Sequence, residues 1–454
     1  MATTASSVTA PPARRLERQD VRTLALSALG GALEFYDFII FVFFVTVLGH
    51  LFFPPGIPDW VVQLQAFAIF AAGYIARPLG GIVLAHYGDK LGRKQMFMVS
   101  ILLMAVSTLG MGLLPTYAQI GIAAPILLLT LRVLQGAAIG GEIPGAWVFV
   151  SEHVPSRRVG LACGILTCGL TAGILLGSLV ATAINTAFTA ETIQAWAWRV
   201  PFLLGGVFGL IGVYLRRWLS ETPVFRAMKE RKALAEELPV KAVIRDHGAA
   251  VILSMLLTWM LAASIVVVIL MTPTLLQTIY GIPAPTALAA NSVATLFLSI
   301  GCIVTGLLCD RFGAGKVLMG GSVLLGGVLY ILYGTVGDMP GSLFPLYGLA
   351  GFLVGTIAAV PYVMVHAFPP AVAFSGVSFA YNVGYAIFGG LTPLMVTLAL
   401  RIDPLAHAHY MLAICLMGLA IGTFLRAGRG AILHNQGRDH VEEASGLEPV
   451  PEAR

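Results

Sequence analysis

Charged residues are scarce in this sequence, and their scarcity indicates its class. Asp, Glu, Lys and Arg make up 11% of the 454 residues, whereas hydrophobic residues make up 58%. Soluble domains carry about 25% charged residues, so an ordinary soluble fold is excluded and a polytopic membrane protein is indicated. The sequence also lacks a nucleophile–base pair, a phosphate-binding loop and metal-ligand spacing. It therefore predicts neither an enzyme nor a bound cofactor or metal.

Disulfides and a cleavable leader are not expected either. The five cysteines all lie within or at the end of apolar segments, which is not the pattern of a disulfide framework. Residues 1–22 are polar, and the apolar run that follows them is too long for the hydrophobic region of a signal peptide.

Twelve apolar runs are long enough to cross a bilayer, and such runs are helical because a helix satisfies its own backbone in lipid. The runs cover roughly residues 23–53, 60–87, 94–114, 119–150, 158–188, 198–218, 248–280, 286–309, 316–336, 342–366, 372–400 and 406–426. Turn residues such as Pro and Gly lie at many of the breaks between them. The predicted fold class is all-α, with twelve transmembrane helices.

Lys and Arg concentrate on one side of these predicted helices. If the N-terminus is cytoplasmic, the inner segments hold 21 of these residues and the outer segments hold two, Arg199 and Arg401. This asymmetry predicts an integral protein of the plasma membrane, in a bacterium the inner membrane, with both termini in the cytoplasm. Topology rather than nucleic-acid binding then explains the net charge of +5.

A long hydrophilic interruption divides the runs six and six. A short motif recurs in both halves, because GDKLGRK at 88–94 follows the second run and CDRFGAGK at 309–316 follows the eighth. Two six-helix halves with matching inner loops are typical of transporters that bind substrate between the halves. The predicted divisions are a cytoplasmic tail 1–22, an N-terminal bundle 23–218, a cytoplasmic linker 219–247, a C-terminal bundle 248–428 and a cytoplasmic tail 429–454.

Several motifs resemble the major facilitator superfamily, and within it the metabolite:proton symporters. They are ALEFYDF at 32–38, RPLGG at 77–81, LRVLQGAAIGGE at 131–142, SEHVPSRRVG at 151–160 and ETPVF at 221–225, in addition to GDKLGRK. The resemblance implies two pseudo-symmetric bundles and uptake of a small solute driven by the proton gradient, without another cofactor. This branch includes carriers for citrate, 2-oxoglutarate, other carboxylates, aromatic acids, and proline or betaine.

Two carboxylates, Glu34 and Asp37, interrupt the first apolar run at a depth near the middle of the bilayer. Their spacing of three residues places them on one helix face. A carboxylate is costly at that depth and usually has a partner and a function. We expect one of the two, with Asp37 as the first choice, to carry the coupled proton. The alternative is a fixed ion pair between the first and fourth helices.

Arg132, in the fourth run, is the expected partner of these carboxylates because a guanidinium stays charged. Arg132, Gln135 and Gly136 match the family motif RxxQG. The resemblance implies that this arginine faces the carboxylate of the first helix. Two roles remain open for it: pairing with Asp37 or Glu34, or binding a substrate carboxylate through two hydrogen bonds. Gln135 is expected beside it at the substrate site.

Further candidates for the substrate path lie on other runs. Arg77, in the second run, belongs either to the substrate site or to a structural pair with Glu142, whose own role stays open. The second half has no clear intramembrane charge, so polar and aromatic side chains are expected to supply its part of the site. These candidates are Tyr381, Asn382 and Tyr385 for the substrate, and His366 as a weaker proton site.

Charged residues at the inner ends of the helices are expected to form a cytoplasmic gate, because opposite charges there can hold the two halves together. The predicted gate consists of Asp89, Gly92, Arg93, Lys94, Glu152, Arg157, Asp310 and Arg311. The resemblance implies that the loop after the second helix sets the balance between inward- and outward-facing states. The alternative is a loop that is basic only because it is cytoplasmic.

Together these features predict a proton symporter, functional as a monomer, that imports a small organic acid, a mono- or dicarboxylate. The fifth run lacks the Gly-Pro pair of drug exporters in the superfamily, which favours uptake. The first alternative is a symporter for a zwitterionic osmolyte such as proline or betaine, although the residues after 430 show no heptads like those of the osmosensing relatives. A membrane sensor without transport is a further alternative.

Overall fold

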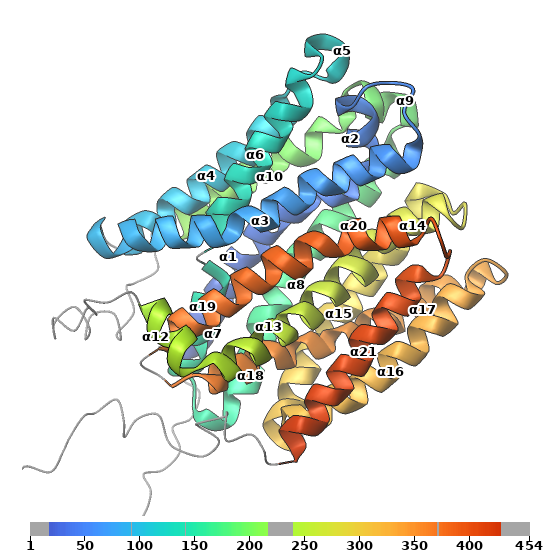
Figure 1. Cartoon of the computed structure of the whole chain (residues 1–454). Coiled ribbons are helices and arrows are strands. Elements are labelled where there is room, and N and C mark those ends of the chain that lie inside the picture. Colours follow the sequence, from blue (N-terminus) through green and yellow to red (C-terminus); the bar gives the residue numbers. More distant parts are fainter. Residues whose placement is uncertain (1–17, 92, 141, 217–238, 370–371, 428–454) are drawn as a thin grey trace, which may run out of the picture.

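The computed structural model describes residues 18–91, 93–140, 142–216, 239–369 and 372–427, and every regular element in these ranges is helical (Figure 1). Ten of the described helices are long and apolar enough to cross a membrane. The pair 190–197 and 199–214, bent by 47°, makes an eleventh if it counts as one span. The third predicted run is helical too, but its described apolar part, Val99–Leu113, is shorter than a span. The predicted all-α fold is confirmed.

The first half of the chain contains the elements up to α10. They are α1 (Arg18–Phe43), α2 (Val45–Phe52), α3 (Asp59–Leu91), α4 (Arg93–Leu113), α5 (Tyr117–Ile120), α6 (Ala123–Ile139), α7 (Glu142–His153), the 3₁₀ turn η1 (Ser156–Arg158), α8 (Val159–Ala187), α9 (Ala190–Thr192), the π-helix η2 (Ile193–Ala197) and α10 (Arg199–Arg216). The first predicted run is broken at Phe44, between α1 and α2. The fourth continues from α6 into α7 after Gly140, where the helix lies against the backbone of Arg77.

The second half contains the elements from α12 onward. They are α12 (Pro239–Asp246), α13 (Gly248–Ala263), the π-helix η3 (Ser264–Met271), α14 (Thr272–Thr278), α15 (Ala284–Phe312), α16 (Ala314–Thr335), the 3₁₀ turns η4 (Pro340–Ser342) and η5 (Gly355–Ala358), α17 (Leu343–Val354), α18 (Ala359–Ala367), α19 (Ala373–Gly384), the π-helix η6 (Tyr385–Gly389), α20 (Gly390–Ala399) and α21 (Ala406–Arg426). The predicted seventh, tenth and eleventh runs are each built from such consecutive pieces.

Prolines explain these irregular turns. Pro273 follows η3, Pro361 follows η5 and Pro393 follows η6. A proline has no N–H for the helical hydrogen bond, and its ring crowds the preceding turn. The carbonyl groups of that turn lose their usual hydrogen-bond donor, and the helix widens to a π-helix or tightens to a 3₁₀ turn there. Each of these three prolines therefore coincides with an irregular helical turn.

Helix α8 is central to the packing, because it lies along α1 on one side and along α15 on the other. On the side of α1, Gly169 and Gly173 lie against Ala28 and Ala32. A side chain at Gly173 would overlap the carbonyl oxygen of Ala32. Small residues allow two helix backbones to approach this closely in a membrane, and α8 can therefore reach both halves of the chain.

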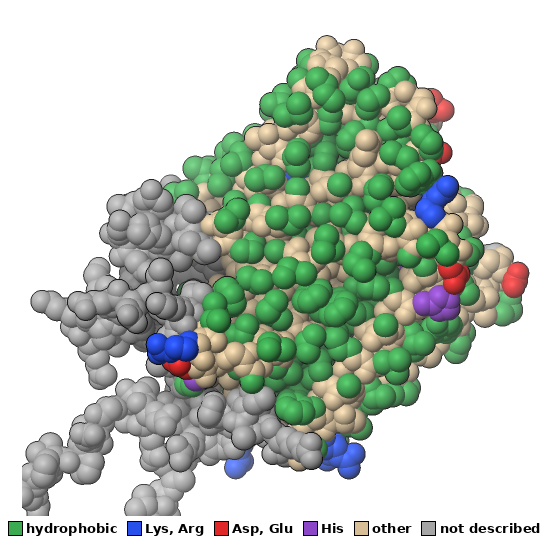
Figure 2. Space-filling model, viewed as in Figure 1, with side chains coloured by type: hydrophobic (Ala, Val, Ile, Leu, Met, Phe, Trp, Pro, Cys, Tyr) green, Lys and Arg blue, Asp and Glu red, His purple; other side chains and the backbone are tan. Residues whose placement is uncertain are grey.

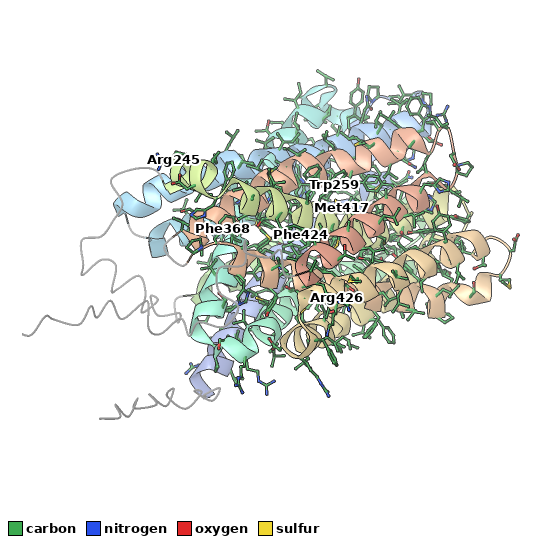
Figure 3. The ribbon with its side chains drawn as sticks, turned by 60° about the horizontal axis from the view of Figure 1, so that its bottom comes forward. Arg245, Trp259, Phe368, Met417, Phe424 and Arg426 are labelled. Atoms are coloured by element: carbon green, nitrogen blue, oxygen red, sulfur yellow. The ribbon has the colours of Figure 1, made fainter. Side chains whose placement is uncertain are left out.

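Apolar side chains cover the outside of the helices, and charged side chains gather toward the ends of the face seen in Figure 2. Leu79 is 67% exposed and Leu324 is 58% exposed. Such a surface is typical of helices that face lipid. Arg245 and Arg426, labelled in Figure 3, lie in α12 and in the last turn of α21, and both are exposed.

Candidate functional site

Arg77 lies in a buried aromatic contact between the two halves of the chain. It is on α3, which packs against α19, η6 and α20 of the second half. Its guanidinium carbon lies 5.8 Å from the ring centre of Tyr74, 5.2 Å from that of Tyr381 and 4.8 Å from that of Tyr385. Ring faces attract a cation at such distances. Arg77 is 1% exposed, and its Nε and Nη2 have no hydrogen-bond partner.

Trp147 and Asn382 bring further unpaired polar atoms to this contact. Trp147, on α7, packs edge-on against Tyr381 with the ring centres 5.0 Å apart, and its Nε1 has no partner. The Nδ2 of Asn382 donates to the carbonyl oxygens of Gly140 and Ser378, while its buried Oδ1 has no partner. Burying a polar atom without a hydrogen bond is costly. The arrangement is therefore suited to a polar ligand.

The structure brings together four of the residues predicted for the substrate site, namely Arg77, Tyr381, Asn382 and Tyr385. The sequence does not single out Trp147, because a tryptophan in an apolar helix is ordinary packing. Only the lack of a partner at its Nε1 marks it, and that is visible in three dimensions alone. The other two predicted members, Arg132 and Gln135, lie in a neighbouring cluster within the first half.

Arg132, on α6, is buried among the rings of that cluster. Its Nη1 donates to the carbonyl oxygen of Phe38 at 2.8 Å and to Oε1 of Gln135. Its guanidinium carbon lies 4.0 Å from the ring centre of Phe38 and 4.8 Å from that of Phe70, and its Nε and Nη2 have no partner. Tyr74 packs on Phe38 and on Phe70 with ring centres 5.0 Å apart in both cases. Tyr74 thus connects this cluster to the first one.

The side chains of Gln135 and Arg132 donate hydrogen bonds to the backbone of α1. The Nε2 of Gln135 donates to the carbonyl oxygen of Asp37 at 2.8 Å and to Oγ1 of Thr108 at 2.7 Å. Arg132 binds the next carbonyl along α1, that of Phe38. Two consecutive carbonyl groups of α1 are therefore fixed from α6, by side chains that the sequence predicted to face carboxylates or substrate.

The expected ion pair between Arg132 and Asp37 is not formed among the described side chains. Asp37 faces α10 instead, where a side-chain carbon at Gly205 would lie 2.6 Å from Asp37 Oδ1 and one at Gly209 would lie 3.3 Å from Oδ2. Consecutive residues point about 100° apart around a helix. Because Phe38 faces Arg132, Asp37 is turned away from it. Asp37 is 2% exposed, and its Oδ1 has no hydrogen-bond partner.

Asp310 links the two halves at the end predicted to be cytoplasmic. Its two carboxylate oxygens accept the backbone N–H groups of Gly160, at 2.7 Å, and Leu161, at 2.9 Å, in the first turn of α8. The start of a helix carries unpaired N–H groups and a partial positive charge, which favour an anion. Asp310 belongs to α15, so this contact ties the second half of the chain to the first.

Hydroxyl groups occupy the contact between α8 and α15 farther along these helices. The hydroxyl oxygens of Thr171 and Ser299 are 2.9 Å apart, and so are those of Ser178 and Ser292. The Nδ2 of Asn291 also donates to the Ser178 hydroxyl at 3.1 Å. We call these five residues the hydroxyl seam. It joins the halves by neutral hydrogen bonds, whereas Asp310 joins them by charge.

The halves are in contact at both ends and in the middle, so this is a closed conformation. Asp310 closes the end predicted to be cytoplasmic. The guanidinium carbon of Arg401 lies 4.7 Å from the ring centre of Trp60 at the opposite end. Between them, the rings of Tyr74 and Tyr385 are 5.2 Å apart. The site around Arg77 is consequently shielded from solvent.

The remaining predicted residues have other surroundings or lie outside the description. Arg157 and Arg311 are exposed, and Arg311 lies over the ring of Phe312. His366 is buried, and its Nδ1 is 2.7 Å from the carbonyl oxygen of Tyr362 on its own helix. Gly92 and the side chains of Asp89, Arg93, Lys94, Glu142 and Glu152 lie outside the described residues.

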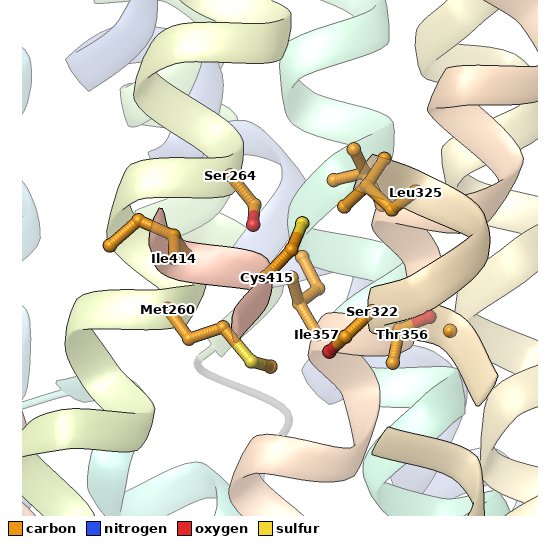
Figure 4. A pocket seen from close by; sticks show the side chains of 10 residues that line it. Met260, Ser264, Ser322, Leu325, Thr356, Ile357, Ile414 and Cys415 are labelled. Atoms are coloured by element: carbon orange, nitrogen blue, oxygen red, sulfur yellow. The ribbon is translucent and has the colours of Figure 1, made fainter. Parts of the chain in front are cut away.

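A small pocket in the second half is a weak candidate for a charged substrate. It lies between α13, α16, η5 and α21, and Ser264, Ser322 and Cys415 are among the residues that line it (Figure 4). None of its ten lining residues is charged. A carboxylate placed there would have no cation to bind, in contrast to the surroundings of Arg77.

Comparisons with known proteins agree with this architecture. The family profile described as Major Facilitator Superfamily matches residues 27–393. The chain is 33% identical over 383 residues to the inner membrane metabolite transport protein YhjE of Escherichia coli, covering 82% of this chain and 86% of that protein. It is 32% identical over 427 residues to the glycine betaine/proline/ectoine/pipecolic acid transporter OusA of Dickeya dadantii, covering 89% and 83% of the two chains.

The fold is shared with solved structures as well. The structure of the proton:xylose symporter XylE matches with a TM-score of 0.72, over 90% of this chain and 95% of that chain, at 17% sequence identity. At an identity this low, the similarity shows a shared fold and nothing about function. The match confirms the predicted all-helical membrane fold.

Proposed function

Because the chain belongs to the Major Facilitator Superfamily, it is a secondary transporter, and we propose that it imports a small zwitterion with a carboxylate, such as proline or betaine, together with protons. The strongest support is the buried guanidinium of Arg77, whose Nε and Nη2 have no partner. A guanidinium binds a carboxylate through two parallel hydrogen bonds. The rings of Tyr74, Tyr381 and Tyr385 would cover the apolar part of such a substrate.

The preference for a zwitterion over an organic acid rests on the relatives. OusA is named for glycine betaine, proline, ectoine and pipecolic acid, which combine a carboxylate with a cationic nitrogen group. This reverses the order of the two substrate classes predicted from the sequence. A mono- or dicarboxylate remains the second candidate. It is favoured by Arg132, a second buried guanidinium with two unpartnered nitrogen atoms, because a dicarboxylate could bind one arginine with each end.

Asp37 is the proposed carrier of the coupled proton. An ionised carboxylate with an unpartnered oxygen is costly in a buried site, and protonation removes that cost. Glu34, one turn earlier on α1, is also buried and is the second candidate. Gln135 and Arg132 bind the α1 backbone beside Asp37. If α6 moved on substrate binding, these hydrogen bonds would move the α1 backbone and with it the Asp37 carboxylate. No direct ion pair between Arg132 and Asp37 would be needed.

Alternating access would be carried by the two bundles predicted at 23–218 and 248–428, rocking about the site between them. In this scheme Asp310 belongs to the cytoplasmic gate, because it ties α15 to the start of α8. The relative YhjE is named as an inner membrane protein, and we place this transporter in the same membrane, with both termini in the cytoplasm.

The test is proton movement in proteoliposomes that contain a pH-sensitive dye. Proline, betaine, monocarboxylates and dicarboxylates are added in turn to the wild type, Asp37→Asn and Arg77→Gln. We expect a zwitterion to drive proton uptake in the wild type. Asp37→Asn should still exchange labelled substrate but move no protons, and Arg77→Gln should lose substrate binding. Substrate exchange without proton movement in the wild type would overturn the symport mechanism, and a response to carboxylates alone would replace the zwitterion by the second candidate.

A further inference from the structure

The aromatic contact around Arg77 contains two more polar groups with an unpartnered atom, the indole of Trp147, which packs on Tyr381, and the amide of Asn382, the next residue along the chain. We propose, on the basis of the function proposed above, that these two residues determine which zwitterion is accepted. The indole N–H of Trp147 binds the substrate carboxylate together with Arg77, and the amide oxygen of Asn382 accepts a hydrogen bond from the substrate ammonium group. The site therefore prefers an imino acid, which carries N–H groups, to a fully N-methylated betaine.

Trp147 is placed as a second donor for the carboxylate. The side chain is buried, with 1% exposed, so water does not satisfy its Nε1. Its ring meets Tyr381 at 87°, and the guanidinium carbon of Arg77 is 5.2 Å from the centre of the same ring. Both donors thus border one aromatic ring, from α7 and from α3. A carboxylate has two oxygens with about four acceptor positions, so it can bind the guanidinium and the indole together.

The amide of Asn382 is oriented by its own hydrogen bonds. Its Nδ2 faces two carbonyl oxygens, those of Ser378 and Gly140. Because carbonyl oxygens only accept, the NH₂ group must face them and Oδ1 must face the other way. This Oδ1 is buried without a partner in a residue that is 4% exposed. A substrate N–H would satisfy it, whereas a trimethylammonium group has no hydrogen to donate.

The aromatic rings support the same preference. A quaternary ammonium ion binds best over free aromatic faces. Here the guanidinium of Arg77 already lies 4.8–5.8 Å from the ring centres of Tyr74, Tyr381 and Tyr385. A second cation at the same rings would be repelled by the guanidinium. An N-methylated substrate therefore loses the hydrogen bond to Asn382 and gains little from the rings.

The experiment compares proline with N,N-dimethylproline. The two ligands share the ring and the carboxylate and differ at the nitrogen, which carries N–H groups in one and methyl groups in the other. Their dissociation constants are measured by titration calorimetry on the purified full chain in lipid nanodiscs. We expect the wild type to bind proline at least about tenfold more tightly, because a site built for an N–H group is left with an unpaired acceptor by the methylated ligand.

Substitutions distinguish the role of Asn382 from that of Trp147. Asn382→Leu removes the acceptor and should abolish the preference by weakening proline alone, whereas Asn382→Gln retains both the amide donor and the amide acceptor and should keep it. Trp147→Phe keeps an aromatic ring and should weaken both ligands by a similar factor, about tenfold. Trp198→Phe is the matched control. Trp198 is another buried indole with an unpartnered Nε1, but it packs on Phe52 and Phe202, so both affinities should stay at the wild-type values.

Equal affinities for the two ligands in the wild type, or a preference that survives in Asn382→Leu, would overturn the role of Asn382. If Asn382→Leu binds neither ligand, the comparison is made with Asn382→Gln, and loss of the preference in that variant overturns the role as well. Wild-type affinities in Trp147→Phe would overturn the role of Trp147. Failure of the proposed function looks different, since the wild type would then bind neither proline nor its dimethyl derivative.

Discussion

Replacing Asp310 by asparagine should shift the protein toward the conformation that is open to the cytoplasm. Both oxygens of the Asp310 carboxylate accept backbone N–H groups of α8, from Gly160 and Leu161. An asparagine side chain has the same shape but a single oxygen, and its NH₂ group would face the second N–H. One charge-assisted hydrogen bond is lost, and the other becomes a neutral one.

The size of the shift follows from these two bonds. A hydrogen bond to a charged group contributes about 1.5–3 kcal/mol and a neutral one about 0.5–1.5 kcal/mol, and the favourable placement of an anion at a helix start adds about 0.3–1 kcal/mol. Asp310 is only partly buried, so the low end applies, and we expect a loss of about 2 kcal/mol. At 1.4 kcal/mol for each factor of ten, this changes the equilibrium between the closed and the inward-open states about thirtyfold.

Two native cysteines can report this shift. Cys163, on α8, and Cys309, on α15, are 0% and 1% exposed in the closed structure, so maleimide reacts with them only after the halves separate. Labelling measured by mass spectrometry should be faster in Asp310→Asn, by up to the same factor of about thirty, because the rate follows the population of the open state. Arg311→Gln is the control, since Arg311 is exposed over Phe312. Unchanged labelling in Asp310→Asn, or equal acceleration in the control, would show that the Asp310 carboxylate does not stabilise the closed state.

Two further substitutions test other contacts. Gly205→Ala should strongly reduce proton-coupled uptake, because the new methyl group would lie 2.6 Å from Asp37 Oδ1, whereas Gly212→Ala on the same helix meets nothing closer than 3.8 Å and should transport normally. Ser178→Ala removes the hydroxyl that pairs with Ser292 and should destabilise the closed state by about 1 kcal/mol or less. Exchange of labelled substrate in proteoliposomes should then be faster, and slower exchange would contradict the expectation.

Most of the helical architecture could be predicted from the sequence because a bilayer constrains length and composition so strongly. Apolar runs of about 20 residues have few alternatives to a membrane-spanning helix. Pro273 and Pro393 also mark irregular turns by local chemistry alone. The sequence does not show whether such a turn is a 3₁₀ or a π-helix, because that depends on how the neighbouring helices pack.

The candidate site was predictable by residue type but not by partner. Arg77 and Tyr381 stand out because their side chains are polar or aromatic in apolar runs, and they do meet. The Asp37–Arg132 pair was expected because opposite charges at similar depth attract. It is not formed because the rotation of α1 directs Phe38 toward α6 and Asp37 toward α10. Such a rotation follows from packing over the whole helix, which one local motif does not contain.

The hydroxyl seam has a consequence for how freely the two halves exchange positions. The Ser292 hydroxyl is also 3.0 Å from the carbonyl oxygen of Leu288, and the Ser299 hydroxyl is 3.1 Å from that of Thr295, each on its own helix. When α8 leaves α15, these two hydroxyls keep an acceptor, whereas Ser178, whose hydroxyl contacts only α15, loses its partners. Opening the seam therefore costs only part of its hydrogen bonds. A solute or proton that binds one of the open and closed states more tightly than the other can then shift their populations.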